Sequence, residues 1–204
     1  MKLYNSIGPN PKAVRMFASE LGTELELHEV DLMAAENRGE DFLRINPAGQ
    51  LPALELDNGA IVSEITAICE YLDEKAGSTP LIGTTPEERA ETRMWVRRID
   101  LGICENMANG FRFGEGKELF TGRMTLIPQA ADDLKQVAQE KLSWLDGQLA
   151  GKEFVGGDRF TLADVLLYAF LEFGAQMAGQ NLNEDNRNIM AWWERTQARP
   201  SASA

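Results

Sequence analysis

Residues 46–72 read NPAGQLPALELDNGAIVSEITAICEYL and constrain the backbone at three successive points. The dipeptide Leu51-Pro52 precedes an apolar run. Proline removes a hydrogen-bond donor there and tolerates the cis form, which predicts a strand entered through a fixed bend. Asp57-Asn58-Gly59 then supplies the residues of a tight turn. Residues 53–56 and 60–62 should therefore pair as an antiparallel hairpin.

A helix is predicted directly after this hairpin. Its apolar side chains recur with α-helical spacing at Ile65, Ile68, Cys69 and Leu72, and Gly77 is placed to end it. Glu64 falls at the positive end of this helix. A bend that exposes the Leu51 N–H and C=O beside such a helix end is suited to an extended peptide with an amine and a carboxylate.

The residues before this stretch predict a strand, a helix and a second strand. Residues 2–5 form the first strand, and residues 11–21 form an amphipathic helix with Asn10 as its N-cap. Residues 25–30 form the second strand. A helical connection makes these two strands parallel. The order βαβ followed by ββα predicts a small thioredoxin-like domain.

Beyond residues 77–86, which are rich in turn-forming residues, only helical patterns remain. Two capping boxes open predicted helices, one at Thr85 to Glu88 and one at Thr161 to Asp164. Further helices are predicted over residues 128–149 and 186–199. The fold class is therefore α/β plus all-α. We expect a thioredoxin-like domain over residues 1–79 and an all-helical domain over residues 86–204.

Composition favours a cytoplasmic globular protein. The chain has 204 residues, 44% hydrophobic and 25% charged, without an apolar run long enough for a bilayer or a secretory signal. A net charge of −12 disfavours nucleic acid and anionic membranes as partners. The two cysteines, Cys69 and Cys104, lie on apolar helix faces and are expected to be buried thiols. With one histidine, His28, we expect no metal site.

The combination of NPAGQLPAL, EITAICEYL and FTLAD, in this order and across the whole chain, resembles the cytosolic glutathione transferases. Gly8-Pro9-Asn10 is similar to the Pro-Asn loop that follows the first strand in bacterial members. The resemblance implies glutathione as co-substrate, a small-molecule electrophile as second substrate, a homodimer and a role in detoxification.

The resemblance also implies a set of glutathione-binding residues. Leu51, before a cis-Pro52, would pair main chain to main chain with the cysteinyl unit. Glu64 and the N–H of Ile65 would hold the γ-glutamyl end. Gln50, and less directly Arg38, would lie near the glycyl carboxylate. Ile65 departs from the family pattern, which usually has a small polar residue there, so one hydroxyl contact is absent.

The sequence leaves the thiol-activating group open among three candidates. The position of the family's serine or cysteine falls on Gly8, which has no side chain. Asn10 ranks first, with helix capping as its alternative role. Ser6 ranks second. Tyr4 ranks third, because many members have an aromatic packing residue there.

Residues 109–124 interrupt the helical pattern, and we expect them to border the second-substrate site. Phe111 and Phe113 are predicted to line an apolar pocket, with Arg112 available to an anionic group. Packing of the two aromatic rings against the core is the equally weighted alternative. Two other functions stay open: a glutathione-dependent disulfide reductase or peroxidase, and a non-catalytic binding module.

Overall fold

The computed structural model describes residues 1–204 and contains a four-stranded mixed sheet in the order β2-β1-β3-β4. The strands are β1 (Lys2–Asn5), β2 (Glu26–Glu29), β3 (Ala53–Glu55) and β4 (Ile61–Ser63). β1 and β2 are parallel, whereas β1–β3 and β3–β4 are antiparallel. The predicted βαβ-ββα order is confirmed.

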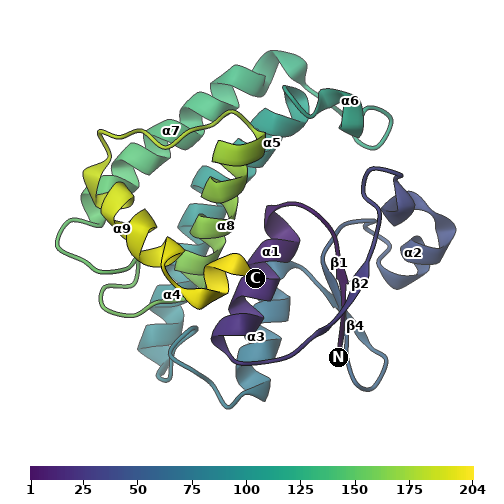
Figure 1. Cartoon of the computed structure of the whole chain (residues 1–204), viewed down its shortest axis with the longest axis horizontal. Coiled ribbons are helices and arrows are strands. Elements are labelled where there is room, and N and C mark those ends of the chain that lie inside the picture. Colours follow the sequence, from purple (N-terminus) through teal and green to yellow (C-terminus); the bar gives the residue numbers. More distant parts are fainter.

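The sheet separates two groups of helices (Figure 1). α1 (Pro9–Glu20) and α3 (Ile65–Lys75) lie between the sheet and the second half of the chain, and α2 (Glu40–Ile45) lies on the other side. A 3-10 turn (Glu36–Arg38) precedes α2. Successive side chains of β1 point to opposite faces of the sheet. Leu3 packs in the main core, and Tyr4 packs in a small cluster with Phe42.

The start of α1 corrects one prediction. Asn10 is not the N-cap, because the helix begins at Pro9 and Gly8 caps it with a φ of 109°. Proline suits the first helical position, and glycine adopts positive φ at little cost. Asn10 therefore lies inside the first turn, between Pro9 and Pro11, which have no N–H.

The second half of the chain is entirely helical, as predicted. Its α-helices are α4 (Pro86–Ile99), α5 (Glu105–Phe113), α6 (Lys117–Phe120), α7 (Ala131–Gln148), α8 (Leu162–Met177) and α9 (Arg187–Gln197). A π-helical turn (Asp100–Cys104) joins α4 to α5, and 3-10 turns cover Pro128–Ala130 and Pro200–Ser203. Both predicted capping boxes are present. None of the helices is both long and apolar enough to cross a membrane.

The predicted helix break at residue 109 is wrong, because α5 continues to Phe113. Asn109-Gly110 read as a stop, but Gly110 serves close packing of α5 against α7. A Cβ at Gly110 would lie 2.7 Å from Cγ of Lys135 and 3.3 Å from the Ala131 carbonyl oxygen. The irregular segment therefore begins at Gly114.

A partly buried ion pair holds the C-terminal turn against α1. Arg199 donates from Nε and Nη2 to the two carboxylate oxygens of Glu20, at 2.9 and 2.7 Å, and Ser201 donates to the same carboxylate. Burial raises the pKa of Glu20, but these hydrogen bonds outweigh it and leave the pKa below its usual value. The contact between the C-terminal turn and α1 therefore depends on an ionised Glu20.

This ion pair should make stability depend on pH. Because its folded-state pKa is lowered, Glu20 stabilises the fold above its unfolded pKa of about 4.3, and this contribution disappears as the pH falls through the folded value. Urea unfolding should show Glu20→Gln less stable than the wild type at pH 7, with a smaller difference near pH 3. Glu24→Gln, at an exposed site, is the control. An equal difference at both pH values would contradict the role of Glu20.

Candidate functional site

A cavity of about 190 Å³ opens where the bend before β3, α1 and α3 meet the helical half of the chain. One wall comes from the thioredoxin-like half and the other from the segment Asp100–Phe113 and α8. The cavity is lined by Asn10, Asn46, Gln50, Leu51, Pro52, Glu64, Ile65, Thr66, Asp100, Glu105, Arg112, Leu166 and Phe170. We call this cavity the cleft.

The bend before β3 presents free main-chain groups to the cleft. The Leu51–Pro52 peptide bond is cis, and neither the N–H nor the C=O of Leu51 is hydrogen-bonded within the chain. Two asparagine side chains hold the preceding loop in place. Asn46 Nδ2 donates to the Gln50 carbonyl at 2.8 Å, and Asn37 Nδ2 donates to the Gly49 carbonyl at 2.7 Å. The bend is therefore a fixed edge with one free donor and one free acceptor.

The start of α3 supplies an acid and an anion-binding helix end. Glu64 occupies the N-cap with a φ of 73°, which is uncommon for a residue with a side chain, and such outliers concentrate at ligand sites. The Glu64 side chain makes no cap hydrogen bond, and the N–H groups of Ile65 and Thr66 donate to no acceptor in the chain. This helix end can hold a carboxylate while Glu64 pairs with an amine.

The three candidates for thiol activation lie in different surroundings. Asn10 lines the cleft, and its side chain has no partner in the chain. Ser6 is buried outside the cleft and donates its hydroxyl proton to the Val30 carbonyl at 2.8 Å. Tyr4 is buried in the small cluster, where its hydroxyl donates to Glu55 Oε2 at 2.8 Å. Burial, followed by this bond, raises the pKa of Tyr4.

The remaining predicted glutathione contacts divide between the cleft and its surroundings. Gln50 and Ile65 line the cleft. Arg38 is exposed and outside it, with Nη1 donating to the Ala48 carbonyl at 3.4 Å. Thr66, which the sequence reasoning missed, brings a hydroxyl to the cleft one position after Ile65.

The wall of the cleft that the helical half of the chain forms is polar because of the π-helical turn. In a regular α-helix, residues five apart point about 140° away from each other. Here Glu105 N donates to the Asp100 carbonyl, and this π-type spacing brings Asp100 and Glu105 to the same face. Arg112 follows Glu105 by two regular turns and faces the same way. Hydrophobic periodicity alone gives no signal for this register change, so Glu105 was missed.

Arg112 is the predicted pocket residue that reaches the cleft. Its side chain is 24% exposed, Nη1 donates to Asn109 Oδ1 at 2.9 Å, and Nη1 lies 3.9 Å from Glu105 Oε2. Burial lowers the pKa of this guanidinium. The carboxyl of Asp100, in contrast, has its pKa raised by burial and then by Glu105.

Phe111 and Phe113 do not line the cleft. Phe111 packs edge-on against Phe120 and Phe173, and Phe113 is buried. Because α5 continues through these residues, their side chains point in different directions from that of Arg112. The apolar part of the cleft instead comes from Leu166 and Phe170 of α8. Both side chains also belong to the buried main core, with 1% and 3% of their surface exposed, so only their edges reach the cleft.

Neither of the two cysteines lines the cleft. Cys69 and Cys104 are free and fully buried, and burial raises the pKa of both thiols well above its usual value.

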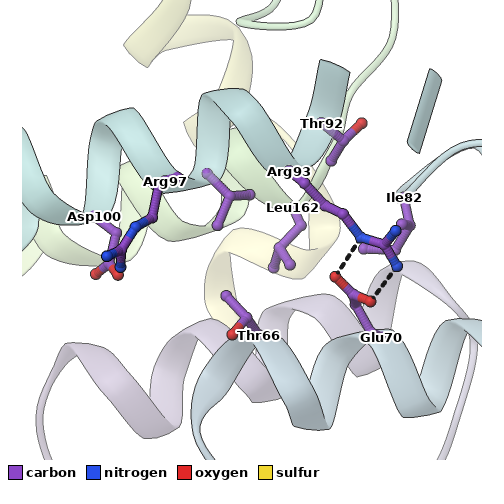
Figure 2. Close-up of a pocket in the computed structure, with 9 residues that line it drawn as sticks. Thr66, Glu70, Ile82, Thr92, Arg93, Arg97, Asp100 and Leu162 are labelled. Atoms are coloured by element: carbon purple, nitrogen blue, oxygen red, sulfur yellow. Dashed lines mark hydrogen bonds and ion pairs between the residues drawn. The ribbon is translucent and has the colours of Figure 1, made fainter. Parts of the chain in front are cut away.

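A second cavity of about 200 Å³ lies between α3 and α4 (Figure 2). It shares Thr66 and Asp100 with the cleft. Figure 2 shows Arg93 paired with Glu70 through two hydrogen bonds, of 2.9 and 2.5 Å, across this cavity. The bidentate pair ties α4 to α3 and neutralises the charges of both partners.

A thioredoxin-like domain followed by a helical domain, with a cleft between them that starts at a bend proline and a helix N-terminus, defines the glutathione transferase class of folds. Residues 1–74 match the family described as "Glutathione S-transferase, N-terminal domain", and residues 122–200 match "Glutathione S-transferase, C-terminal domain".

Individual proteins agree with these family matches. Glutathione S-transferase 2 of Saccharomyces cerevisiae is 30% identical, over 98% of this chain and 87% of that protein. The crystal structure of Gtt2 from Saccharomyces cerevisiae superposes with a TM-score of 0.93 at 29% identity, covering 100% of this chain and 99% of that one. A glutathione transferase family member from Pseudomonas fluorescens, solved with two glutathione bound, has a TM-score of 0.83 at 25% identity, covering 99% and 90%. The chain belongs to the glutathione S-transferase family.

Proposed function

We propose that this chain binds glutathione in the cleft and joins it through its sulfur to a small, largely apolar electrophile. The observation that carries the proposal is the convergence of the free Leu51 main chain, Glu64 and the unpaired start of α3 on one cavity. These groups complement an extended tripeptide with an internal amide and a zwitterionic end. The Pseudomonas fluorescens structure with bound glutathione supports the same assignment by similarity.

Three contacts would hold glutathione. Its cysteinyl amide pairs with the N–H and C=O of Leu51. Its γ-glutamyl ammonium pairs with Glu64, and the adjoining carboxylate accepts from the N–H groups of Ile65 and Thr66. The Thr66 hydroxyl replaces the contact that Ile65 lacks. The glycyl carboxylate extends towards Gln50, and Arg38 reaches it only by leaving the Ala48 carbonyl.

The reaction requires an ionised thiol. A free thiol titrates near 8.5, and a lowering of its pKa by about two units corresponds to about 2.7 kcal/mol of thiolate stabilisation. The Asn10 amide and the unbonded Asn10 main-chain N–H at the positive end of α1 supply hydrogen bonds of that size. The thiol proton passes to water, and the thiolate forms a C–S bond as the leaving group departs with its electron pair.

The buried cysteines favour the transferase over a reductase that uses its own thiol. A mixed disulfide between protein and glutathione needs an accessible thiolate. Both Cys69 and Cys104 are inaccessible. Assays with glutathione and chlorodinitrobenzene, a peroxide, or a mixed disulfide test this choice, and turnover of the aromatic halide is the expected result.

The family resemblance supports three further parts of the proposal. The domains meet between residues 79 and 86, the chain acts as a homodimer, and it works in the cytoplasm in detoxification. Sedimentation of the purified chain at micromolar concentration tests the oligomeric state, with a dimer as the expected species.

Asn10→Ala should raise the pKa of the bound glutathione thiol by about one to two units, because one hydrogen bond to a charged group contributes about 1.5–3 kcal/mol. Ser6→Ala and Tyr4→Phe should leave it unchanged, since both hydroxyls are engaged outside the cleft. The pH dependence of kcat/KM with chlorodinitrobenzene measures this pKa. The same pKa in Asn10→Ala as in the wild type would exclude the amide as the activating group.

A further inference from the structure

We propose that Arg112 makes the cleft selective for electrophiles that carry a carboxylate, with the apolar body of the substrate packed on Leu166 and Phe170. The inference rests on the proposed function, because it names the substrate class of the same site. It extends that function from a generic apolar electrophile to an amphipathic, anionic one.

The first observation is that the Arg112 guanidinium is incompletely paired. A guanidinium has five N–H donors in a planar fork. Nη1 donates to Asn109, while Nε and Nη2 of Arg112 have no hydrogen-bond acceptor in the chain. The side chain is 24% exposed and neither of these two nitrogens is fully buried, so both can donate to an anionic ligand.

The second observation is that Arg112 is held in place and has one long ion pair, with Glu105. Asn109 lies one turn before it on α5 and orients Nη1, and the ring of Phe120 lies 5.9 Å from the guanidinium carbon. Glu105 is the nearest acid, but its carboxylate is 3.9 Å away, beyond hydrogen-bond distance, and half exposed to water. The fork is therefore oriented and available for a bidentate pair with a ligand carboxylate.

The third observation concerns the acids of the cleft, which would otherwise favour a cation. Glu64 lies on the opposite wall, where the ammonium of glutathione is its partner under the proposed function. The positive charge of Arg97 compensates part of the charge of Asp100. Glu105 is solvated. Arg112 is the basic residue among those that line the cleft, so an anionic group of the second substrate would pair with it.

The apolar half of the recognition comes from α8. Leu166 and Phe170 lie one turn apart on this helix and reach the same cleft as Arg112. A flat apolar body that touches the edges of these two side chains can present a carboxylate to the guanidinium while its electrophilic carbon faces the thioredoxin-like wall. An uncharged substrate of the same shape would gain the apolar contacts alone.

Direct binding tests this selectivity without requiring turnover. Calorimetry would compare 3,5-dinitrobenzoate with its methyl ester, neither of which has a leaving group. Arg112→Gln should weaken binding of the acid about tenfold or more and change that of the ester less than about threefold. Arg112→Lys should fall between the two, because it keeps the charge and loses the fork. Arg98→Gln, at an exposed arginine outside the cleft, should match the wild type.

Each other outcome overturns the proposal. Equal loss of acid and ester in Arg112→Gln would mean that Arg112 supports the shape of the cleft instead of recognising the anion. Tighter binding of the ester than of the acid by the wild type would mean that the acids dominate. Turnover of 4-chloro-3,5-dinitrobenzoate and its methyl ester extends the comparison to kcat/KM. Binding of glutathione itself is measured separately, so failure of the proposed function is distinguished from failure of this inference.

Discussion

Glu64→Gln should weaken glutathione binding about tenfold to a hundredfold. Glu64 occupies the N-cap of α3 without using its carboxylate there, so its charge is available to the γ-glutamyl ammonium. A hydrogen bond between charged groups contributes about 1.5–3 kcal/mol, which corresponds to this range of Kd. Glutamine keeps the size of the side chain and removes the charge. Calorimetric titration with glutathione measures the change.

A matched control separates the site from general electrostatics. Glu74→Gln removes one negative charge from the other end of the same helix, where the carboxylate pairs with Arg89 instead of lining the cleft. Its affinity for glutathione should equal that of the wild type. Equal affinity of Glu64→Gln and the wild type would show that the start of α3 does not bind the amine.

Asp164→Ala should lower the free energy of unfolding by about 3–5 kcal/mol, because it leaves several buried donors without an acceptor. Asp164 is fully buried and accepts hydrogen bonds from Val155 N at 2.9 Å and Trp192 Nε1 at 2.8 Å. It also accepts from Thr161, through the main-chain N–H at 2.9 Å and through the hydroxyl at 3.1 Å. This carboxylate therefore links the start of α8 to the preceding loop and to α9.

Urea unfolding of Asp164→Ala measures this loss, with Asp158→Ala as the control at an exposed acid in the loop before α8. The control should differ from the wild type by less than about 0.5 kcal/mol. Asp164→Ala should retain the wild-type affinity for glutathione under conditions where it is folded. A loss of less than about 1 kcal/mol would mean that solvent satisfies the freed donors.

Local sequence patterns were sufficient to predict the structure where a short pattern specifies one backbone conformation. Gly59 in the hairpin turn, Pro86 after a threonine N-cap and Asp164 in a capping box each specify their own surroundings, and the structure contains all three features. The proposed glutathione-binding edge follows from such signals, since Leu51 and Glu64 are placed by a bend and a helix start that the sequence encodes locally.

The opposite wall of the cleft could not be predicted in the same way. Its register depends on the π-helical turn after Ile99, which leaves no mark on the apolar pattern, and on the passage of α5 through Asn109-Gly110. Both effects depend on packing against α7 and α8, whose residues are distant in the sequence. For this reason Arg112 was found while its neighbour in the cleft, Glu105, was not.

The hydrogen-bond partners of Ser6 and Tyr4 could not be predicted for a related reason. Each hydroxyl is taken by a partner on another strand or its extension, Val30 for Ser6 and Glu55 for Tyr4. Sequence gives the residue type but not the direction of the side chain relative to the sheet. The structure thus leaves Asn10 as the candidate whose side chain lines the cleft.

The measurement that tests the central claim most directly is a titration of the thiol in the complex of the wild-type chain with glutathione, followed by the ultraviolet absorbance of the thiolate. If the cleft binds glutathione and α1 activates its sulfur, the bound thiol should ionise about two units below the free value of about 8.5. A thiol that titrates near 8.5 in the presence of saturating protein, or the absence of any complex, would contradict the assignment of this cleft.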